Sequence, residues 1–246
     1  MTRLDETTRR GVLAAGGILA VTGVTAVGVA EFSDDDGRES AAPAPIRAST
    51  ATTSLGLDLS GLPVMGSMDA PVDLYYYTDY QCPFCGRFEA ETLPDLLDNE
   101  VSAGDVRLVF VSYPYIGPAS RTAAVVDRCV WRQVRAENPA AWWDWHTTLF
   151  DEQGQPNSGW ASREQLFEFA ERVDGVDATA VEDCVAANEE AVADAVAADV
   201  EQAGEFGVGA SPSFVVANRQ TERAGRIVGA QPYARFKDAF DRIRDA

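Results

Sequence analysis

The sequence predicts an α/β fold in which an all-helical insertion separates a strand–helix–strand half from a strand–strand–helix half. Two apolar runs, 71–78 and 106–112, predict buried strands, and helical spacing between them predicts a parallel βαβ unit. Residues 118–207 have helical patterns throughout. Two short strands, at 213–217 and 225–228, then precede a C-terminal helix at 232–244.

The first half is built around the apolar strand 71–78, which holds three consecutive tyrosines. The helix that follows places large apolar residues at helical spacing, which predicts that they share one buried side. These residues are Phe84, Phe88, Leu93, Leu96 and Leu97. Pro94 lies inside this pattern and should kink the helix, because proline lacks the N–H that a helix interior needs.

The insertion and the second half are delimited by turn signals. Breaks are expected at Asn138-Pro139, at 154–159 and at Asp174-Gly175, which divide 118–207 into several helices. In the final helix, the aromatic and aliphatic residues at helical spacing predict one buried face. They are Tyr233, Phe236, Phe240 and Ile243.

The first thirty residues predict a targeting segment. Arg9-Arg10 precedes an uncharged run, Gly11–Ala30, as in a twin-arginine export signal. Residues 28–30 are small and suit a cleavage site, but the run is also close to the length that spans a bilayer. A cleaved signal and a retained membrane anchor therefore both remain open, and both place the rest of the chain outside the cytoplasm.

Residues 31–54 separate this segment from the folded part. The stretch starts with three consecutive aspartates and continues with Ala, Ser, Thr and Pro, with almost no large apolar side chains. Such a composition cannot support a core, so we expect a flexible spacer and a folded domain over 55–246.

The chain is strongly acidic, with 39 acidic residues against 20 basic ones and a formal net charge of -19. Lys237 is the only lysine. No basic patch is present, which excludes a nucleic-acid partner. The acids run along the whole chain rather than forming a tail, and this favours a surface adapted to high salt, as in extreme halophiles, over steering of cationic partners.

A Cys-x-x-Cys motif, Cys82-Pro83-Phe84-Cys85, stands between the first strand and its helix. Unpaired N–H groups and a partial positive charge at the helix N-terminus stabilise a thiolate there. We therefore expect Cys82 to be the nucleophile with a lowered pKa, and Cys85, one turn later, to be more buried and to close a disulfide. Pro83 suits the first helical turn.

The alternative interpretation of this motif is half of a zinc site. A four-cysteine zinc ribbon needs a second Cys-x-x-Cys pair, which the sequence lacks, and His146 is the only histidine. We therefore expect neither a metal nor any other cofactor.

Three motifs resemble the DsbA-like branch of the thioredoxin superfamily: Tyr80–Cys85, Ala141–His146 and Gly209–Phe214. The resemblance covers about residues 60–246. It implies a thioredoxin fold with the helical insertion between its βαβ and ββα halves. It also implies that Pro212 is cis, close to the active cysteines, and that Ser211 and Pro212 line the substrate groove.

The sequence departs from that family in two places. Many members have a buried acid six residues before the first active cysteine, and here that position is Tyr76. A tyrosine with an ordinary pKa near 10 is a poor base at neutral pH, so water or Asp79 is the candidate to replace it. Pro83-Phe84 also lacks the histidine of the strongest oxidants, which favours a moderate redox potential.

Two further cysteines, Cys129 and Cys184, lie in separate predicted helices of the insertion. Four cysteines in an exported chain allow three pairings. The resemblance implies a structural disulfide between these two, worth about 3 to 4 kcal/mol; two free buried thiols are the alternative. The aromatic cluster Trp142, Trp143, Trp145 and His146 favours packing of the insertion over a surface for unfolded chains, with His146 as a hydrogen-bonded structural residue.

Together these features predict an exported thiol–disulfide oxidoreductase that introduces disulfides into reduced or unfolded exported proteins. The resemblance implies a membrane partner, a DsbB-like or VKOR-like quinone reductase, that reoxidises the site. A reductase using the same cysteines is the nearest alternative, because direction depends on potential and partner. A chaperone-like binder of unfolded chains is a third interpretation, which the intact Cys82, Cys85 and Pro212 disfavour.

Overall fold

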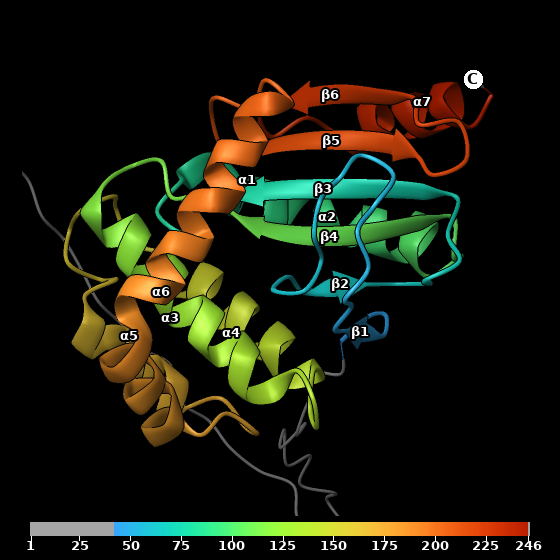
Figure 1. Cartoon of the computed structure of the whole chain (residues 1–246). Coiled ribbons are helices and arrows are strands. Elements are labelled where there is room, and N and C mark those ends of the chain that lie inside the picture. The colour runs from blue at the N-terminus through green and yellow to red at the C-terminus, as the bar shows by residue number, and fades with distance from the viewer. Residues whose placement is uncertain (1–41, 246) are drawn as a thin grey trace, which may run out of the picture. The chain divides into compact units, whose positions relative to one another are not determined.

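The computed structural model describes residues 42–245 and contains a six-stranded mixed sheet. The strand order is β1-β2-β4-β3-β5-β6 (Figure 1). The strands are β1 Ile46–Arg47, β2 Val64–Met65, β3 Val72–Thr78, β4 Val106–Ser112, β5 Ser213–Asn218 and β6 Ala224–Val228. β3 and β4 are parallel, with Val72 opposite Val106, and the other pairs are antiparallel.

The helices follow the predicted pattern, with four of them between β4 and β5. They are α1 Pro83–Glu91, α2 Leu93–Leu96 with a π-helical turn η1 Leu97–Val101, α3 Pro118–Val134, α4 Ala140–Asp151, α5 Arg163–Glu171, α6 Ala178–Glu205 and α7 Tyr233–Arg244. At Pro94, where a kink was expected, the helix is interrupted: α1 ends at Glu91 and α2 begins at Leu93. The predicted fold class, a thioredoxin fold with a helical insertion, is also confirmed.

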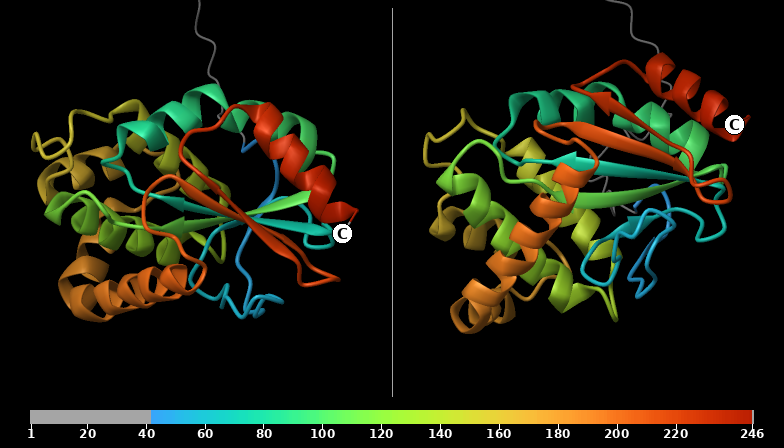
Figure 2. Two further views of the ribbon diagram at one scale, coloured as in Figure 1. Left: turned by 90° about the horizontal axis from the view of Figure 1, so that it is seen from above. Right: turned by 45° about the horizontal axis from the view of Figure 1, so that its top comes forward.

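The two faces of the sheet bury alternate residues of β3, because successive strand side chains point to opposite faces. Tyr76 packs on one face with Phe88 of α1 and Phe214 of β5, under α1, α2 and α7. Tyr75 and Tyr77 belong to the second core on the other face, which segment 55–64 and the end of α6 cover. Figure 2 shows these covers on opposite sides of the sheet.

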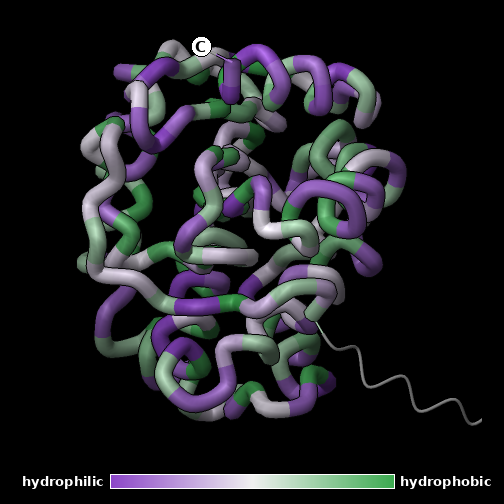
Figure 3. Tube along the Cα trace, turned by 90° about the vertical axis from the view of Figure 1, so that its right-hand side faces the viewer, coloured by the Kyte–Doolittle hydropathy of each residue, from purple (hydrophilic) through white to green (hydrophobic). Residues whose placement is uncertain are grey.

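The outer helices are amphipathic. In α7, Phe236 and Phe240 are fully buried, while Arg235, Lys237 and Asp238 are exposed. Hydrophilic and hydrophobic residues accordingly mix along this helix near the C-terminal label in Figure 3. Burial of the apolar stripe is what holds α7 against the sheet.

The segment 42–54 corrects the expected spacer. Ile46 and Arg47 form β1, which pairs with β2, and Ala44 and Ile46 are buried. Thr52 also bridges to Asp58. The segment is folded because its one large aliphatic residue, Ile46, is covered by the core next to Met65. Residues 31–41 of the expected spacer lie outside the described residues.

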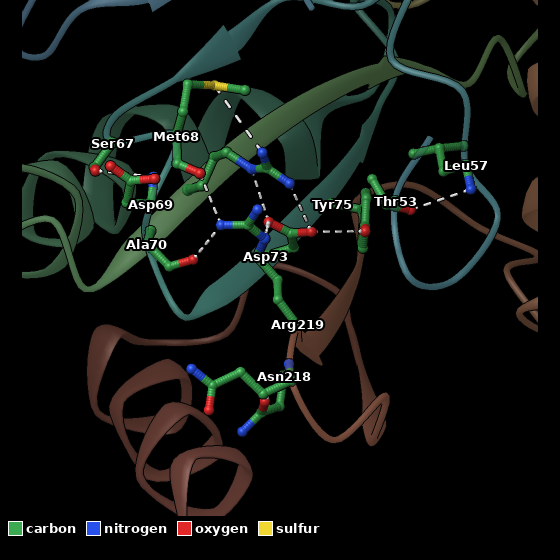
Figure 4. Close-up of polar contacts among 12 residues, drawn as sticks. Thr53, Leu57, Ser67, Met68, Asp69, Ala70, Asp73, Tyr75, Asn218 and Arg219 are labelled. Atoms are coloured by element: carbon green, nitrogen blue, oxygen red, sulfur yellow. Dashed lines mark hydrogen bonds and ion pairs between the residues drawn. The ribbon is translucent and has the colours of Figure 1, made fainter. Parts of the chain in front are cut away.

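A buried ion pair secures the start of β3 (Figure 4). Cys82 follows the opposite end of this strand. Arg107 of β4 donates from Nε and Nη2 to both carboxylate oxygens of Asp73, at 2.8 and 2.9 Å. Arg219 lies beside the pair and donates to the carbonyls of Met68 and Ala70, at 2.7 Å each. The start of β3 is therefore tied to β4, and the loop that enters β3 is tied to Arg219, the residue that directly follows β5.

The first and the last of the four insertion helices are joined covalently. Cys129 of α3 and Cys184 of α6 form a disulfide with a Cα–Cα distance of 5.8 Å.

Within residues 42–245, no helix combines the length and the apolar character that crossing a bilayer requires. The expected targeting segment, 1–30, lies outside the described residues.

Candidate active site

Cys82 occupies the N-cap position of α1, where β3 has just ended. Its N–H donates to the Asp79 carbonyl at 2.9 Å, which closes a tight turn, and Pro83 begins the helix. The carbonyl of Cys82 accepts from the N–H groups of Cys85 and Gly86, at 2.9 and 3.1 Å. The strand end and the helix start therefore fix both cysteines at one edge of the sheet.

The two thiols are free and differ in access to solvent. Cys82 retains 3% exposure, and Cys85 is fully buried at 0%. The backbone N–H of Asp79 points to Cys85 Sγ at 3.5 Å. Only Cys82 is thus open to an incoming sulfur atom.

The electrostatic surroundings separate the two thiols further. The Cys85 thiol donates a hydrogen bond that lowers the pKa of Cys82 to about 6, against the opposing effect of burial. The Ser211 side chain and the backbone N–H groups of Cys85 and Phe84 also lower this pKa. Burial, with the nearby Cys82 sulfur, raises the pKa of Cys85 well above its ordinary value. Near neutral pH the site therefore holds one thiolate and one thiol.

The loop before β5 meets this helix end. The Ser211–Pro212 peptide bond is cis, and the carbonyl of Ser211 lies 3.3 Å from Cys82 Sγ. The Ser213 hydroxyl holds the loop by donating to the Ala210 carbonyl at 2.7 Å. Ser211 and Pro212, 129 and 130 positions after Cys82 in the chain, thus lie beside the Cys82 sulfur.

Asp79 supports the turn through its carboxylate, a role that sequence reasoning missed. The carboxylate accepts from the backbone N–H groups of Gln81, Tyr115 and Ile116, at 2.8 to 2.9 Å. It ties the β4–α3 loop to the active-site turn. Because these donors occupy both oxygens, Asp79 is committed to structure.

Gln153, just after α4, is a second support that the sequence did not reveal. Its Nε2 donates to the carbonyls of Tyr80 and Cys82, at 2.7 and 3.1 Å. A single glutamine in a polar loop carries no sequence signal for such a contact. It fixes the insertion against the active-site turn.

Asp127 is a buried acid at the junction of the sheet and the insertion. Its Oδ1 accepts from the Tyr80 hydroxyl and from the indole N–H groups of Trp142 and Trp145, at 2.9 to 3.1 Å. The hydroxyl of Ser112 donates to Oδ2. The tryptophans are thus packed inside rather than displayed to solvent. An acid within the apolar run of α3 was the signal that could have identified this position.

Tyr76 and His146 are both fully buried. Burial and the nearby Glu89 carboxylate raise the pKa of Tyr76 well above its ordinary value, so this phenol cannot serve as a base. The ring nitrogens of His146 meet the Tyr80 hydroxyl at 2.9 Å and Glu89 Oε1 at 3.1 Å. His146 is thus fully engaged in hydrogen bonds, and Glu89 is a residue that sequence reasoning missed.

The prediction that Phe84 lies on the buried side of the first helix is wrong, because this side chain is 55% exposed. Helical spacing puts it near Phe88, but the first turn of α1 lies beyond the carboxyl end of β3 (Figure 1), and Phe84 belongs to neither hydrophobic core. The Arg87 guanidinium lies over its ring at 4.9 Å. Tyr115, in the loop that Asp79 holds, is 60% exposed. Two aromatic side chains are therefore presented around the cysteines.

Comparison with known proteins gives a consistent result. A family model described as thioredoxin matches residues 60–238. Disulfide bond formation protein D of Bacillus subtilis (strain 168) is 35% identical over 104 residues, which are 42% of this chain and 45% of that protein. Probable disulfide bond formation protein D of Bacillus anthracis is 26% identical over 102 residues, with the same coverage of 42% and 45%. The match thus spans less than half the length of these relatives.

Two solved structures have the same architecture. Oxidised BdbD from Bacillus subtilis gives a TM-score of 0.66 at 26% identity, covering 81% of this chain and 100% of that chain. Wolbachia pipientis α-DsbA1 gives 0.65 at 17% identity, covering 79% and 96%, which is a likeness of fold. With the Cys-x-x-Cys motif at the start of α1 and the helical insertion, these matches show that the chain belongs to the thioredoxin family, and its architecture is that of the DsbA-like thiol–disulfide oxidoreductases.

Proposed function

We propose that this protein is an exported oxidoreductase that introduces disulfides into reduced or unfolded exported proteins through Cys82 and Cys85. The observation that carries the proposal is the difference between the two thiols: Cys82 has a pKa of about 6, and Cys85 is buried with a raised pKa. A stabilised Cys82 thiolate favours the reduced form of the site, so its disulfide is readily donated. The names of the curated relatives support the same direction.

The reaction proceeds in two exchanges. A substrate thiolate attacks Cys82 Sγ, the only active-site sulfur with solvent access, and the Cys82–Cys85 bond breaks as a mixed disulfide forms. The second substrate thiol then attacks the substrate sulfur that is bonded to Cys82, which closes the substrate disulfide and releases the Cys82 thiolate. A low-pKa thiol is a good leaving group, which suits Cys82 to this second step. The cysteines need no cofactor for these exchanges.

The surroundings of Cys82 suit an extended, partly apolar substrate. Phe84 and Tyr115 are exposed aromatic side chains around the site. Ser211 and Pro212 lie beside Cys82, and we assign them to the substrate groove. Apolar contact with Phe84 and Tyr115 favours unfolded substrates, because an unfolded chain exposes apolar side chains that a folded one buries.

Export is supported from two sides. The twin-arginine pattern at Arg9-Arg10 directs residues beyond 30 out of the cytoplasm, whether the segment is cleaved or retained. The Cys129–Cys184 disulfide fits an oxidising compartment. A DsbB-like or VKOR-like quinone reductase in the membrane is the partner we assign to reoxidation, and the acidic surface suits high salt.

A direct test is transfer of disulfides to a reduced, unfolded test protein in concentrated salt. Cys82→Ser should abolish transfer, whereas Cys85→Ser, supplied with oxidised glutathione as the oxidant, should accumulate a mixed disulfide at Cys82, visible by non-reducing electrophoresis. Transfer that survives Cys82→Ser would exclude the proposal. A reduction potential of about -120 to -180 mV supports the oxidase, and one near about -270 mV would assign the site to a reductase.

A further inference from the structure

Cys85 presents a chemical difficulty for the first exchange. When a substrate sulfur attacks Cys82, the electron pair of the broken bond stays on Cys85 Sγ. Cys85 is fully buried, and burial raises its pKa well above the ordinary value, so it is a poor leaving group as a bare thiolate. A proton must reach this sulfur, yet the family's acid is replaced by Tyr76.

A line of hydroxyl groups leads away from Cys85. The Thr78 hydroxyl is a hydrogen-bond partner of Cys85 Sγ. The same hydroxyl donates to the Tyr76 phenol at 2.9 Å. Both side chains are buried on β3, and Tyr76 is held by stacking on Phe214 with ring centroids 5.0 Å apart. A hydroxyl both accepts and donates a proton, so this pair can pass one along without changing charge.

The line ends at a carboxyl–imidazole pair. The Tyr76 phenol hydrogen-bonds to Glu89 of α1, and Glu89 Oε1 lies 3.1 Å from His146 Nε2. Tyr80 donates its hydroxyl proton to Asp127, so His146 Nδ1, at 2.9 Å, must donate to Tyr80. His146 Nε2 can then face Glu89 this closely only if the two groups share a proton.

The pair also reaches solvent. Glu89 lines an open groove of about 240 Å³ between α1–α2 and α4, together with Trp143, Thr147 and Asp151. The Glu89 side chain is 9% exposed, in contrast to 0% for His146. The groups that face its carboxyl are Tyr76 from β3, Tyr80 from the active-site turn and His146 from α4, with Asp151 across the groove. Water in the groove can therefore restore a proton to the pair.

Asp79 is the competing acceptor, since its backbone N–H contacts Cys85 Sγ. Its carboxylate, however, is occupied by three backbone N–H donors from Gln81, Tyr115 and Ile116. Moving a proton onto this carboxylate would break contacts that hold the turn and the β4–α3 loop together. Glu89 has no such backbone donors among the contacts of the described residues.

We propose that Thr78 and Tyr76 form a proton relay between Cys85 and the Glu89–His146 pair, which exchanges protons with the groove. The inference rests on the proposed dithiol chemistry and assigns the group that acts where the family's acid is missing. Cys85 Sγ is the reacting atom, and the other residues act by delivering a proton to it.

The step balances as follows. The substrate sulfur bonds to Cys82 as the Cys82–Cys85 bond breaks, and Cys85 Sγ takes the proton of Thr78. Thr78 takes that of Tyr76, and Tyr76 takes the proton of the Glu89–His146 pair, which water in the groove replaces. Thr78 Oγ1 and the Tyr76 hydroxyl oxygen lie 2.9 Å apart, which is close enough for either hydroxyl to pass its proton to the other.

The test is the reaction of the full oxidised protein with reduced glutathione across a range of pH, with the reverse reaction measured using oxidised glutathione. Glu89→Gln removes the acid with little change in shape, and Tyr76→Phe removes only the hydroxyl while keeping the stacked ring. Glu91→Gln is the matched control, because Glu91 is an exposed acid on the same helix. Rapid quenching and mass spectrometry follow the Cys82–glutathione mixed disulfide.

Glu89→Gln and Tyr76→Phe should each slow the reaction at neutral pH by about tenfold or more, as for loss of a general acid–base group. Tyr76→Phe should slow both directions by one factor and change the equilibrium ratio less than twofold, which a merely structural role would not do. Glu91→Gln should match the wild type. Because Tyr76→Phe preserves packing, it decides the matter even if Glu89→Gln does not fold.

A Tyr76→Phe variant that reacts at the wild-type rate would overturn the relay, whether or not Glu89→Gln is slowed. Equal slowing by Glu91→Gln would also overturn it, because a general charge effect would then be responsible. If the wild-type protein itself exchanged no disulfide with glutathione, the proposed function would fail, and this result is distinct from failure of the relay alone.

Discussion

The pKa of Cys82 depends chiefly on the buried neighbour Cys85, because the Cys85 thiol is the first of the groups that lower it to about 6. Cys85→Ala should remove this donor and leave the Ser211 side chain and the helix N–H groups. We expect the Cys82 pKa to rise above about 7. At about pH 7 the thiolate fraction should then fall from about 90% to less than half.

The assay is ultraviolet absorbance of the thiolate as the reduced variant is titrated. Alkylation rates are less direct, because nucleophilicity rises as the thiol pKa rises and conceals part of the change. Cys85→Ser is the matched control, since its hydroxyl can still donate to Cys82 and should retain part of the shift. If Cys85→Ala titrated near pH 6, the helix N-terminus would be the main cause and this reasoning would be refuted.

Three further outcomes follow from the structure. Because folding lowers the pKa of Cys82, the ionised thiol stabilises the reduced protein. This contribution is full above the unfolded pKa near 8.5 and is lost as pH falls through about 6. Calorimetry of the reduced protein should show a contribution of up to about 3 kcal/mol, which the oxidised protein should lack. Asp73→Ala leaves Arg107 buried and unpaired and should cost about 3 to 5 kcal/mol in urea unfolding, whereas an exposed pair would cost under about 1. Replacing Cys129 and Cys184 by alanine opens a link between residues 55 positions apart and should cost about 4 kcal/mol in the same assay, with disulfide transfer retained at low temperature.

The features that sequence could predict are local ones. The Cys82–Cys85 motif follows a buried strand and begins a helix, so its geometry depends on a few adjacent residues. Periodicity likewise predicted β4 at its observed bounds, Val106–Ser112. Pro94 interrupts the helix for a reason inherent in its ring.

What sequence could not predict depends on contacts between distant segments. Glu89 is an ordinary helical acid until α4 brings His146 against it, 57 positions later. Phe84 has the spacing of a buried residue, and only the end of the sheet leaves it exposed. Strands β1 and β2 have two residues each, too few for periodicity to detect.

The same two thiols also determine how the reduction potential depends on pH. Below about pH 6 both are protonated on reduction, so the potential should fall by about 59 mV per pH unit, and above it by about 30 mV, because Cys82 stays a thiolate while Cys85 takes a proton. Equilibration with glutathione at several pH values measures both slopes.

At about pH 7, a pKa of about 6 instead of 8.5 stabilises the reduced form by about 1.4 kcal/mol, equivalent to about 30 mV. This is a small part of the roughly 150 mV between thioredoxin and DsbA, and the absence of a histidine between Cys82 and Cys85 agrees with that moderate contribution. A slope near 59 mV maintained to pH 8 would mean that Cys82 is an ordinary thiol. The argument that makes Cys82 the leaving group would then fail, whichever direction the electrons flow.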